Sequence, residues 1–140
     1  MRTIVLVSCG AEKADAAVPA KELYLSSRFR QQRTYAEKRQ TDGWYILSAK
    51  HGLVDPETIV EPYDQSLMGM PKAERRAWAV QVWSQLEPRL SGIDCVVIFA
   101  GKEYREFLEL YLSDRGIKVE VPLRGMRQGQ QLKAMKELLR

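Results

Sequence analysis

The chain has 140 residues and a net charge of +4, with 45% of its residues hydrophobic and 29% charged. These values are typical of one globular domain, residues 1–140, that buries a core without disulfide staples. Its two cysteines make no disulfide framework, its apolar start is too short for a signal peptide, and no stretch approaches the length of a membrane span. The sequence therefore predicts a cytoplasmic protein and excludes a disulfide-rich or membrane-spanning one.

Four short apolar runs predict strands, and the stretches between them have helical periodicity. The first run is almost continuously apolar, which is typical of a strand covered on both faces. The expected strands are residues 3–8, 44–47, 93–100 and 118–121. The expected helices are residues 20–40, 71–90, 101–116 and 130–140, and residues 58–64 are expected to form a short extended piece.

The alternation of strands and helices predicts the α/β fold class. Right-handed crossovers between successive strands lead to a three-layer sandwich around a mainly parallel, four-stranded sheet. We expect the strand order 2-1-3-4, in which the first and third strands are neighbours at a topological switch point. The loops at Cys9, His51 and Gly101 are then expected to meet in one crevice.

The strongest candidate for a site is the polar loop that follows the second strand. It contains Ser48, Lys50, His51 and Asp55. Ligands of open α/β sheets bind beyond the carboxyl ends of strands. His51 is the only histidine, and an imidazole titrates near neutrality, which suits a general acid or base. Asp55 and Asp64 are candidates for positioning a water.

Cys9 has two interpretations, which the sequence leaves open. A thiol becomes a nucleophile when nearby positive charge lowers its pKa, and Lys13, Lys50 and His51 are candidates for that charge. The alternative is a small buried apolar residue, which is also the expected role of Cys95. Gly101 begins a helix and could present backbone N–H groups to a phosphate. No metal-ligand spacing occurs, and we expect neither a metal nor a cofactor.

Basic residues gather in the first and last helical regions. Such clusters suit a phosphate backbone, but they are equally typical of solvated helix faces. The candidate nucleic-acid surface consists of Arg28, Arg30, Arg33, Arg124 and Arg127.

Residues 7–13, 23–29, 47–56 and 61–64, which read VSCGAEK, LYLSSRF, LSAKHGLVDP and EPYD, resemble a family of small bacterial and phage domains. More distantly, they are similar to the lysine-transfer region of archaeosine synthase. That region is related in fold to uracil-DNA glycosylases, and the peroxide-stress DNA-binding family belongs to the same neighbourhood. The resemblance implies a uracil-DNA-glycosylase-like fold and a pocket that handles a nucleobase.

The leading functional hypothesis is hydrolysis of the N-glycosidic bond of a modified or damaged base in DNA. Its catalytic candidates are Asp55, Asp64, His51 and Cys9. Its candidates for binding a base or a phosphate are Ser8, Gly10, Lys13, Tyr24, Ser26, Ser48, Lys50, Tyr63, Gly101 and Tyr104. One alternative is attack by Cys9 on the nitrile of a 7-deazaguanine-type base. The other is a non-catalytic accessory domain that binds nucleic acid or a nucleotide.

The expected partner is a nucleic acid, DNA in preference to RNA, or a free nucleoside or nucleotide. No membrane partner is expected, and the oligomeric state is left open.

Overall fold

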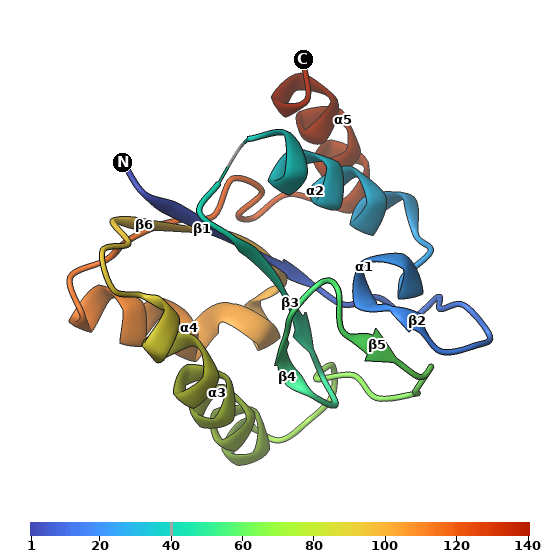
Figure 1. Cartoon of the computed structure of the whole chain (residues 1–140), viewed down its shortest axis with the longest axis horizontal. Helices are drawn as coiled ribbons and strands as arrows, with labels where there is room; N and C mark the ends of the chain where they lie inside the picture. Colours follow the sequence, from blue (N-terminus) through green and yellow to red (C-terminus); the bar gives the residue numbers. More distant parts are fainter. Residues whose placement is uncertain (40) are drawn as a thin grey trace.

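A computed structural model describes residues 1–39 and 41–140 and shows one main sheet between two layers of helices (Figure 1). The main sheet has the order β4-β3-β1-β6-β7. Its strands are β1 Thr3–Ser8, β3 Trp44–Ser48, β4 Gly52–Val54, β6 Cys95–Phe99 and β7 Lys118–Glu120. The four strands expected from the apolar runs are all present, pairwise parallel and in the expected relative order.

The expectation of a four-stranded sheet is corrected by β4, which pairs antiparallel with β3 and makes the sheet mixed and five-stranded. This strand has only three residues and lies within the polar loop after β3. Local periodicity does not reveal so short a strand, because its stability depends on the neighbour with which it pairs.

Two helices cover each face of the main sheet. Helices α2 Ser27–Lys38 and α5 Gln128–Leu138 lie on one face, and α3 Lys72–Leu86 and α4 Lys102–Asp114 lie on the other (Figure 1). A 3₁₀ turn, η1 Glu87–Arg89, follows α3. The side chains of β1, β3 and β6 between these layers are almost all fully buried. No helix in the described part of the chain is long and apolar enough to cross a membrane.

The single helix expected over residues 20–40 is two helices in the structure, and Gln40 lies outside the described residues. Helix α1 Ala20–Leu23 ends at Tyr24, and α2 begins after Ser26. Tyr24 forms a β-bridge with Lys13, and the Leu25 backbone N–H donates to the Glu12 carbonyl at 3.0 Å. These long-range hydrogen bonds extend the backbone between the two helices.

A small two-stranded sheet and α1 lie beyond the carboxyl ends of β1 and β3 (Figure 1). Strands β2 Val18–Pro19 and β5 Ile59–Val60 pair antiparallel, so part of the stretch expected to be extended is a strand. The pairing of β2 with β5 therefore joins the segment that follows β1 to the segment that follows the β3–β4 hairpin.

Candidate functional site

The loop after β3 is the three-residue connection of a β-hairpin. Ser48 ends β3, and its buried hydroxyl accepts hydrogen bonds from the backbone N–H groups of Lys50 (3.3 Å) and His51 (3.1 Å). Gly52 then adopts φ +76°, a left-handed conformation that glycine reaches without steric cost. Ser48 pairs directly with Gly52 in the β3–β4 register. Lys50 and His51 consequently project from the hairpin tip, where both are exposed.

A cavity of about 410 Å³ lies beside this hairpin, and we call it the His51 cavity. Its polar wall consists of Lys50, His51, Asp55, Thr58, Glu61 and Arg89. Its apolar wall consists of Leu53, Val54, Ile59 and Val60. An apolar wall with a few convergent polar groups is the usual composition of a small-molecule site.

The imidazole of His51 is held in its neutral form near pH 7. Although the side chain is exposed at the hairpin tip, partial desolvation lowers its pKa below the ordinary value of 6.5, and the neighbouring Lys50 ammonium lowers it further. The ring also meets the ring of Tyr63 edge to face, with 5.5 Å between centroids. Because the imidazole is neutral, the positive charge of this cavity comes from Lys50 and Arg89. The neutral ring can itself accept a proton.

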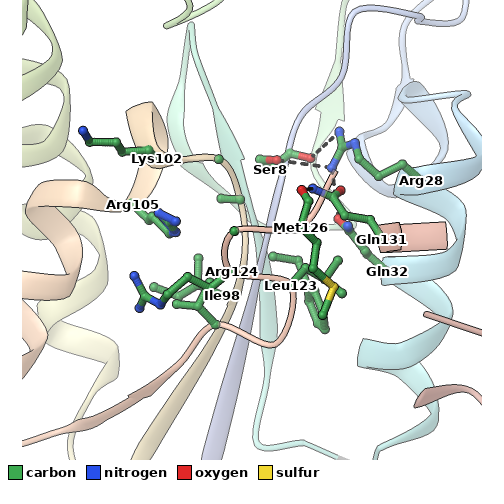
Figure 2. A pocket seen from close by; sticks show the side chains of 15 residues that line it. Ser8, Arg28, Gln32, Ile98, Lys102, Arg105, Leu123, Arg124, Met126 and Gln131 are labelled. Carbon is green, nitrogen blue, oxygen red and sulfur yellow. Dashed lines mark hydrogen bonds between the residues drawn. The ribbon is translucent and has the colours of Figure 1, made fainter. Parts of the chain in front are cut away.

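A second cavity, of about 370 Å³, lies at the carboxyl ends of β1 and β6, and we call it the Arg28 cavity (Figure 2). Figure 2 shows Arg28, Gln32 and Gln131 along one side and Lys102, Arg105 and Arg124 along the other. Ser8 and Gly101 also line it. The switch point between β1 and β6 therefore opens into a basic cavity.

Arg28 is fixed by acceptors at the end of β1. Its guanidinium donates to the Cys9 carbonyl (2.9 Å), the Ser8 carbonyl (3.4 Å) and the Ser8 hydroxyl (3.3 Å). It also donates to the Gln32 side chain at 3.0 Å. A Cβ at Gly10 would lie 3.4 Å from Arg28 Nη2, which is an ordinary van der Waals contact. Burial lowers the pKa of Arg28.

A buried network of hydroxyl groups connects the end of β3 with the segment between α1 and α2. The Tyr63 hydroxyl is 2.7 Å from the Ser48 hydroxyl and 2.6 Å from the Tyr24 hydroxyl. Burial raises the pKa of Tyr24 to about 12 and raises that of Tyr63 as well, so both phenols stay neutral. The Lys13 ammonium lies 4.6 Å from the centroid of the Tyr63 ring. Tyr24 is almost completely buried, so it supports the loops and has little surface to offer a stacked base.

Cys9 is buried and contacts Tyr104. The Sγ atom lies 3.7 Å from the Tyr104 hydroxyl, which also accepts a hydrogen bond from the Leu67 backbone N–H at 3.3 Å. Burial raises the pKa of Tyr104, and Cys9 raises it further. Cys95, which also has a raised pKa through burial, lies within β6.

The structure does not gather the expected site residues in a single crevice. Lys50, His51 and Asp55 line the His51 cavity, Ser8 and Gly101 line the Arg28 cavity, and the other catalytic and base- or phosphate-binding candidates line neither. The His51 cavity and the Arg28 cavity share no lining residue. Asp64 is exposed and lines neither of them. Ser26 caps α2, because its hydroxyl accepts a hydrogen bond from the Phe29 backbone N–H at 3.2 Å.

The model of a family of unknown function, DUF6884, matches residues 4–137. The chain belongs to this family. It is also 31% identical to the uncharacterized protein YfjM of Bacillus subtilis (strain 168) over 121 residues, which cover 81% of this chain and 79% of that protein. No solved structure matches the chain significantly. The expectation of a family of small bacterial domains is confirmed.

The DUF6884 domain also has site residues that the sequence did not single out. Arg89 reaches the His51 cavity from the turn after α3, and Lys102 and Arg105 reach the Arg28 cavity from α4. These residues lie far along the chain from the loops that they approach, so the sequence does not show that they share a cavity with those loops. The position of Lys102, just after a glycine that begins a helix, was the one available signal. Among residues 1–39 and 41–140, no group of three or more His, Cys, Asp or Glu side chains is arranged for a metal ion.

The surface arginines differ in how free their guanidinium groups are. Arg30 and Arg127 are exposed. Arg33 is held by Glu37 at 3.3 Å and by the Lys21 carbonyl at 3.0 Å. Arg124 forms an ion pair with Glu109, which raises its pKa.

Proposed function

We propose that this DUF6884 domain hydrolyses the N-glycosidic bond of a modified or damaged nucleobase, with the His51 cavity as its reaction centre. The observation that supports this proposal is the convergence of Lys50, His51 and Asp55 on one cavity with an apolar wall. All three belong to the loop that the sequence singled out. A volume of about 410 Å³ lies within the usual range of ligand pockets.

The reaction would exchange a carbon–nitrogen bond for a carbon–oxygen bond. The bond between sugar C1′ and the base nitrogen breaks, and its electron pair leaves with the base. A water oxygen bonds to C1′ and gives up a proton, while the base takes one up. By analogy with glycosidases, the transition state resembles an oxocarbenium ion, so positive charge develops on the sugar and negative charge on the base.

The cavity carries charges of both signs that suit this transition state. Asp55 and Glu61 provide carboxylates that can hold the water and stabilise the sugar. A hydrogen bond of 3.0 Å from the Glu57 backbone N–H to Oδ1 orients the Asp55 side chain. Lys50 provides positive charge for the departing base, and neutral His51 is available to accept or pass on a proton. We assign the water to Asp55 over Asp64, because Asp64 does not line the cavity.

The resemblance to uracil-DNA-glycosylase-like domains supports DNA as the partner. A base in a duplex has to leave the stack before its glycosidic bond is accessible, and basic surface holds the strand while it does so. The exposed Arg30 and Arg127 and the parallel strand order β3-β1-β6-β7 are consistent with such a domain.

The nitrile chemistry proposed for Cys9 has less support from the geometry. Cys9 is only 8% exposed, and its thiol contacts the Tyr104 hydroxyl. A reactive thiol needs access as well as positive charge, and a thiol as buried as this one is typical of a cysteine in a core. A binding domain without catalysis is the remaining alternative.

The proposal is tested with oligonucleotides that carry a panel of modified bases, by mass spectrometry for free base and abasic strand. We expect Asp55→Asn to slow release about 100-fold or more while the DNA stays bound, because a water-positioning carboxylate acts mainly in the transition state. Asp64→Asn and Asp114→Asn, which remove equal charge outside the cavity, should release base at close to the wild-type rate. Binding without release of any base would favour the accessory-domain alternative.

The pH profile of the same assay tests His51. Because its pKa is lowered, His51 should become protonated only below pH 6.5, so activity should fall on the acid side with a midpoint below that value. His51→Gln should remove this part of the acid limb. An unchanged acid limb in the variant would exclude His51 from proton transfer.

A further inference from the structure

The Arg28 cavity has a positive charge that its own side chains do not balance. Its four basic side chains are Arg28, Lys102, Arg105 and Arg124, and no carboxylate side chain lines it. Glu109, from outside the lining, pairs with both Arg105 and Arg124. Within the described part of the chain, neither Arg28 nor Lys102 has an ion-pair partner within 4.0 Å. One carboxylate therefore serves a cluster of four cations.

Arg28 is held in place by neutral groups, so that its charge remains available. Its partners are the carbonyls of Ser8 and Cys9 and the side chains of Ser8 and Gln32. These acceptors orient the guanidinium at the end of β1 but bring no negative charge. Taking a cation out of water is unfavourable, and an anion in the adjoining cavity would offset that cost.

Arg105 faces Arg28 across the cavity, and its ion pair with Glu109 is long. Its Nε is inaccessible to water and has no hydrogen-bond acceptor in the structure, and it lies 3.7 Å from the Glu109 carboxylate. The side chain is 12% exposed. Figure 2 shows Arg105 extending from α4 toward the middle of the cavity, opposite Arg28. Two guanidinium groups from different helices thus approach one space.

The backbone adds a further favourable field. Gly101 is the N-cap of α4, a helix of 13 residues, and it lines the cavity. Partial positive charge accumulates at the amino end of a helix and favours an anion there. Beneath these polar groups, Ile98, Val121 and Leu123 form an apolar floor.

We propose that the Arg28 cavity binds the phosphate group of a phosphate monoester, in the form of a nucleoside 5′-monophosphate. A phosphate dianion matches the excess of positive charge better than a single carboxylate does. It also offers several oxygens to two guanidinium groups, whose planar forks suit bidentate contacts. The volume of about 370 Å³ exceeds the need of an inorganic phosphate ion, and the apolar floor leaves room for the attached nucleoside.

This site is separate from the proposed reaction centre, because the two cavities have no lining residue in common. Binding is measured without turnover, so absence of glycosidic hydrolysis would leave the phosphate proposal standing. Likewise, a failure to bind phosphate would not affect the proposed glycosidic hydrolysis, which is tested by the release of base from oligonucleotides.

The test is isothermal titration calorimetry of the full chain at low ionic strength, with the four common ribonucleoside 5′-monophosphates, their nucleosides and inorganic phosphate. We expect at least one monophosphate to bind, its nucleoside to bind at least tenfold more weakly, and inorganic phosphate to compete. Arg105→Gln should weaken the monophosphate about tenfold or more, because charge-assisted hydrogen bonds are lost. Arg115→Gln, which removes one charge at the other end of α4, should change its affinity less than twofold.

Arg105→Lys serves as the second variant in case the neutral side chain disturbs folding, which circular dichroism will check. It keeps the charge but loses the planar fork, so it should also bind the monophosphate more weakly than the wild type. The proposal is overturned if no monophosphate binds, if monophosphates and nucleosides bind equally, or if the folded Arg105 variants behave like Arg115→Gln.

Discussion

At the scale of single residues, Tyr63 connects the two loops of the candidate site. Its hydroxyl joins Ser48, at the end of β3, to Tyr24, in the break between α1 and α2. Its ring meets His51 on one side and the Lys13 ammonium on another. One side chain therefore holds in register segments that are far apart in the sequence, and the raised phenol pKa values keep this contact unchanged through neutral pH.

Tyr63→Phe tests this role. The substitution removes two hydrogen bonds and leaves the buried Tyr24 hydroxyl without its partner, so we expect the free energy of unfolding to fall by roughly 1–3 kcal/mol. Urea denaturation measures the change. Tyr111→Phe is the matched control, because Tyr111 packs on Trp83 and its hydroxyl has no hydrogen bond in the described part of the chain. Equal effects in the two variants would show that the network contributes nothing to stability.

At the scale of elements, the β3–β4 hairpin determines where Lys50 and His51 project. Gln85 on α3 secures its outer strand, since Gln85 Oε1 accepts a hydrogen bond from the Leu53 backbone N–H at 2.8 Å. The Trp78 indole N–H donates to the Ser48 carbonyl at 2.9 Å. Helix α3 thus contacts both strands of the hairpin, and Gln85 satisfies a backbone N–H of the edge strand β4.

Gly52→Ala tests the fit of this hairpin against α3. A Cβ at Gly52 would overlap Gln85 Oε1, in addition to the strain of a φ of +76°. A left-handed residue costs roughly 1–2 kcal/mol, and we expect Gly52→Ala to lose about 1 kcal/mol more than that. Gly69→Ala is the control, because Gly69 has a similar φ of +82° with no atom within 4 Å of the added carbon. Thermal unfolding with equal losses at both positions would contradict the close fit.

At the scale of the whole molecule, basic residues gather near the carboxyl ends of the central strands β1 and β6. The Arg28 cavity lies at the carboxyl ends of β1 and β6, and the exposed Arg30 and Arg127 belong to α2 and to the loop before α5 on the same side. Arg33 is engaged by Glu37, so it contributes less to this surface than its sequence position indicates. The net charge of +4 is therefore unevenly distributed.

Salt dependence tests whether this surface binds DNA. If Arg30 and Arg127 each contact a phosphate, replacing both by glutamine should reduce the slope of log affinity against log salt by about 1.8, or about 0.9 for each contact. Fluorescence anisotropy with a labelled duplex over a range of salt concentrations measures the slope. A double variant of Arg115 and Lys118, near the amino end of β7, should leave it unchanged. Binding that is absent or independent of salt would assign Arg30 and Arg127 to an ordinary solvated surface.

The sequence by itself determined those strands and helices whose positions follow from the local pattern of apolar residues. The apolar runs at 3–8, 44–47, 93–100 and 118–121 locate four strands of the sheet, because burial on both faces leaves a near-continuous apolar signature. Their order β3-β1-β6-β7 agrees with the order expected from a topological switch point between the first and third strands. The placement of Lys50 and His51 in a loop at the end of a buried strand followed from the same patterns, as did Asp55 nearby.

Only the tertiary structure decided the features that depend on contacts between distant segments. Two backbone hydrogen bonds, from the Leu25 N–H to the Glu12 carbonyl and from the Ala14 N–H to the Leu23 carbonyl, divide the helical stretch 20–40 and override its local periodicity. The three-residue strand β4 exists because β3 and Gln85 provide its partners. The separation of the His51 cavity from the Arg28 cavity, and the approach of Arg105 to Arg28, follow from how helices pack on the sheet, which no local stretch of sequence encodes.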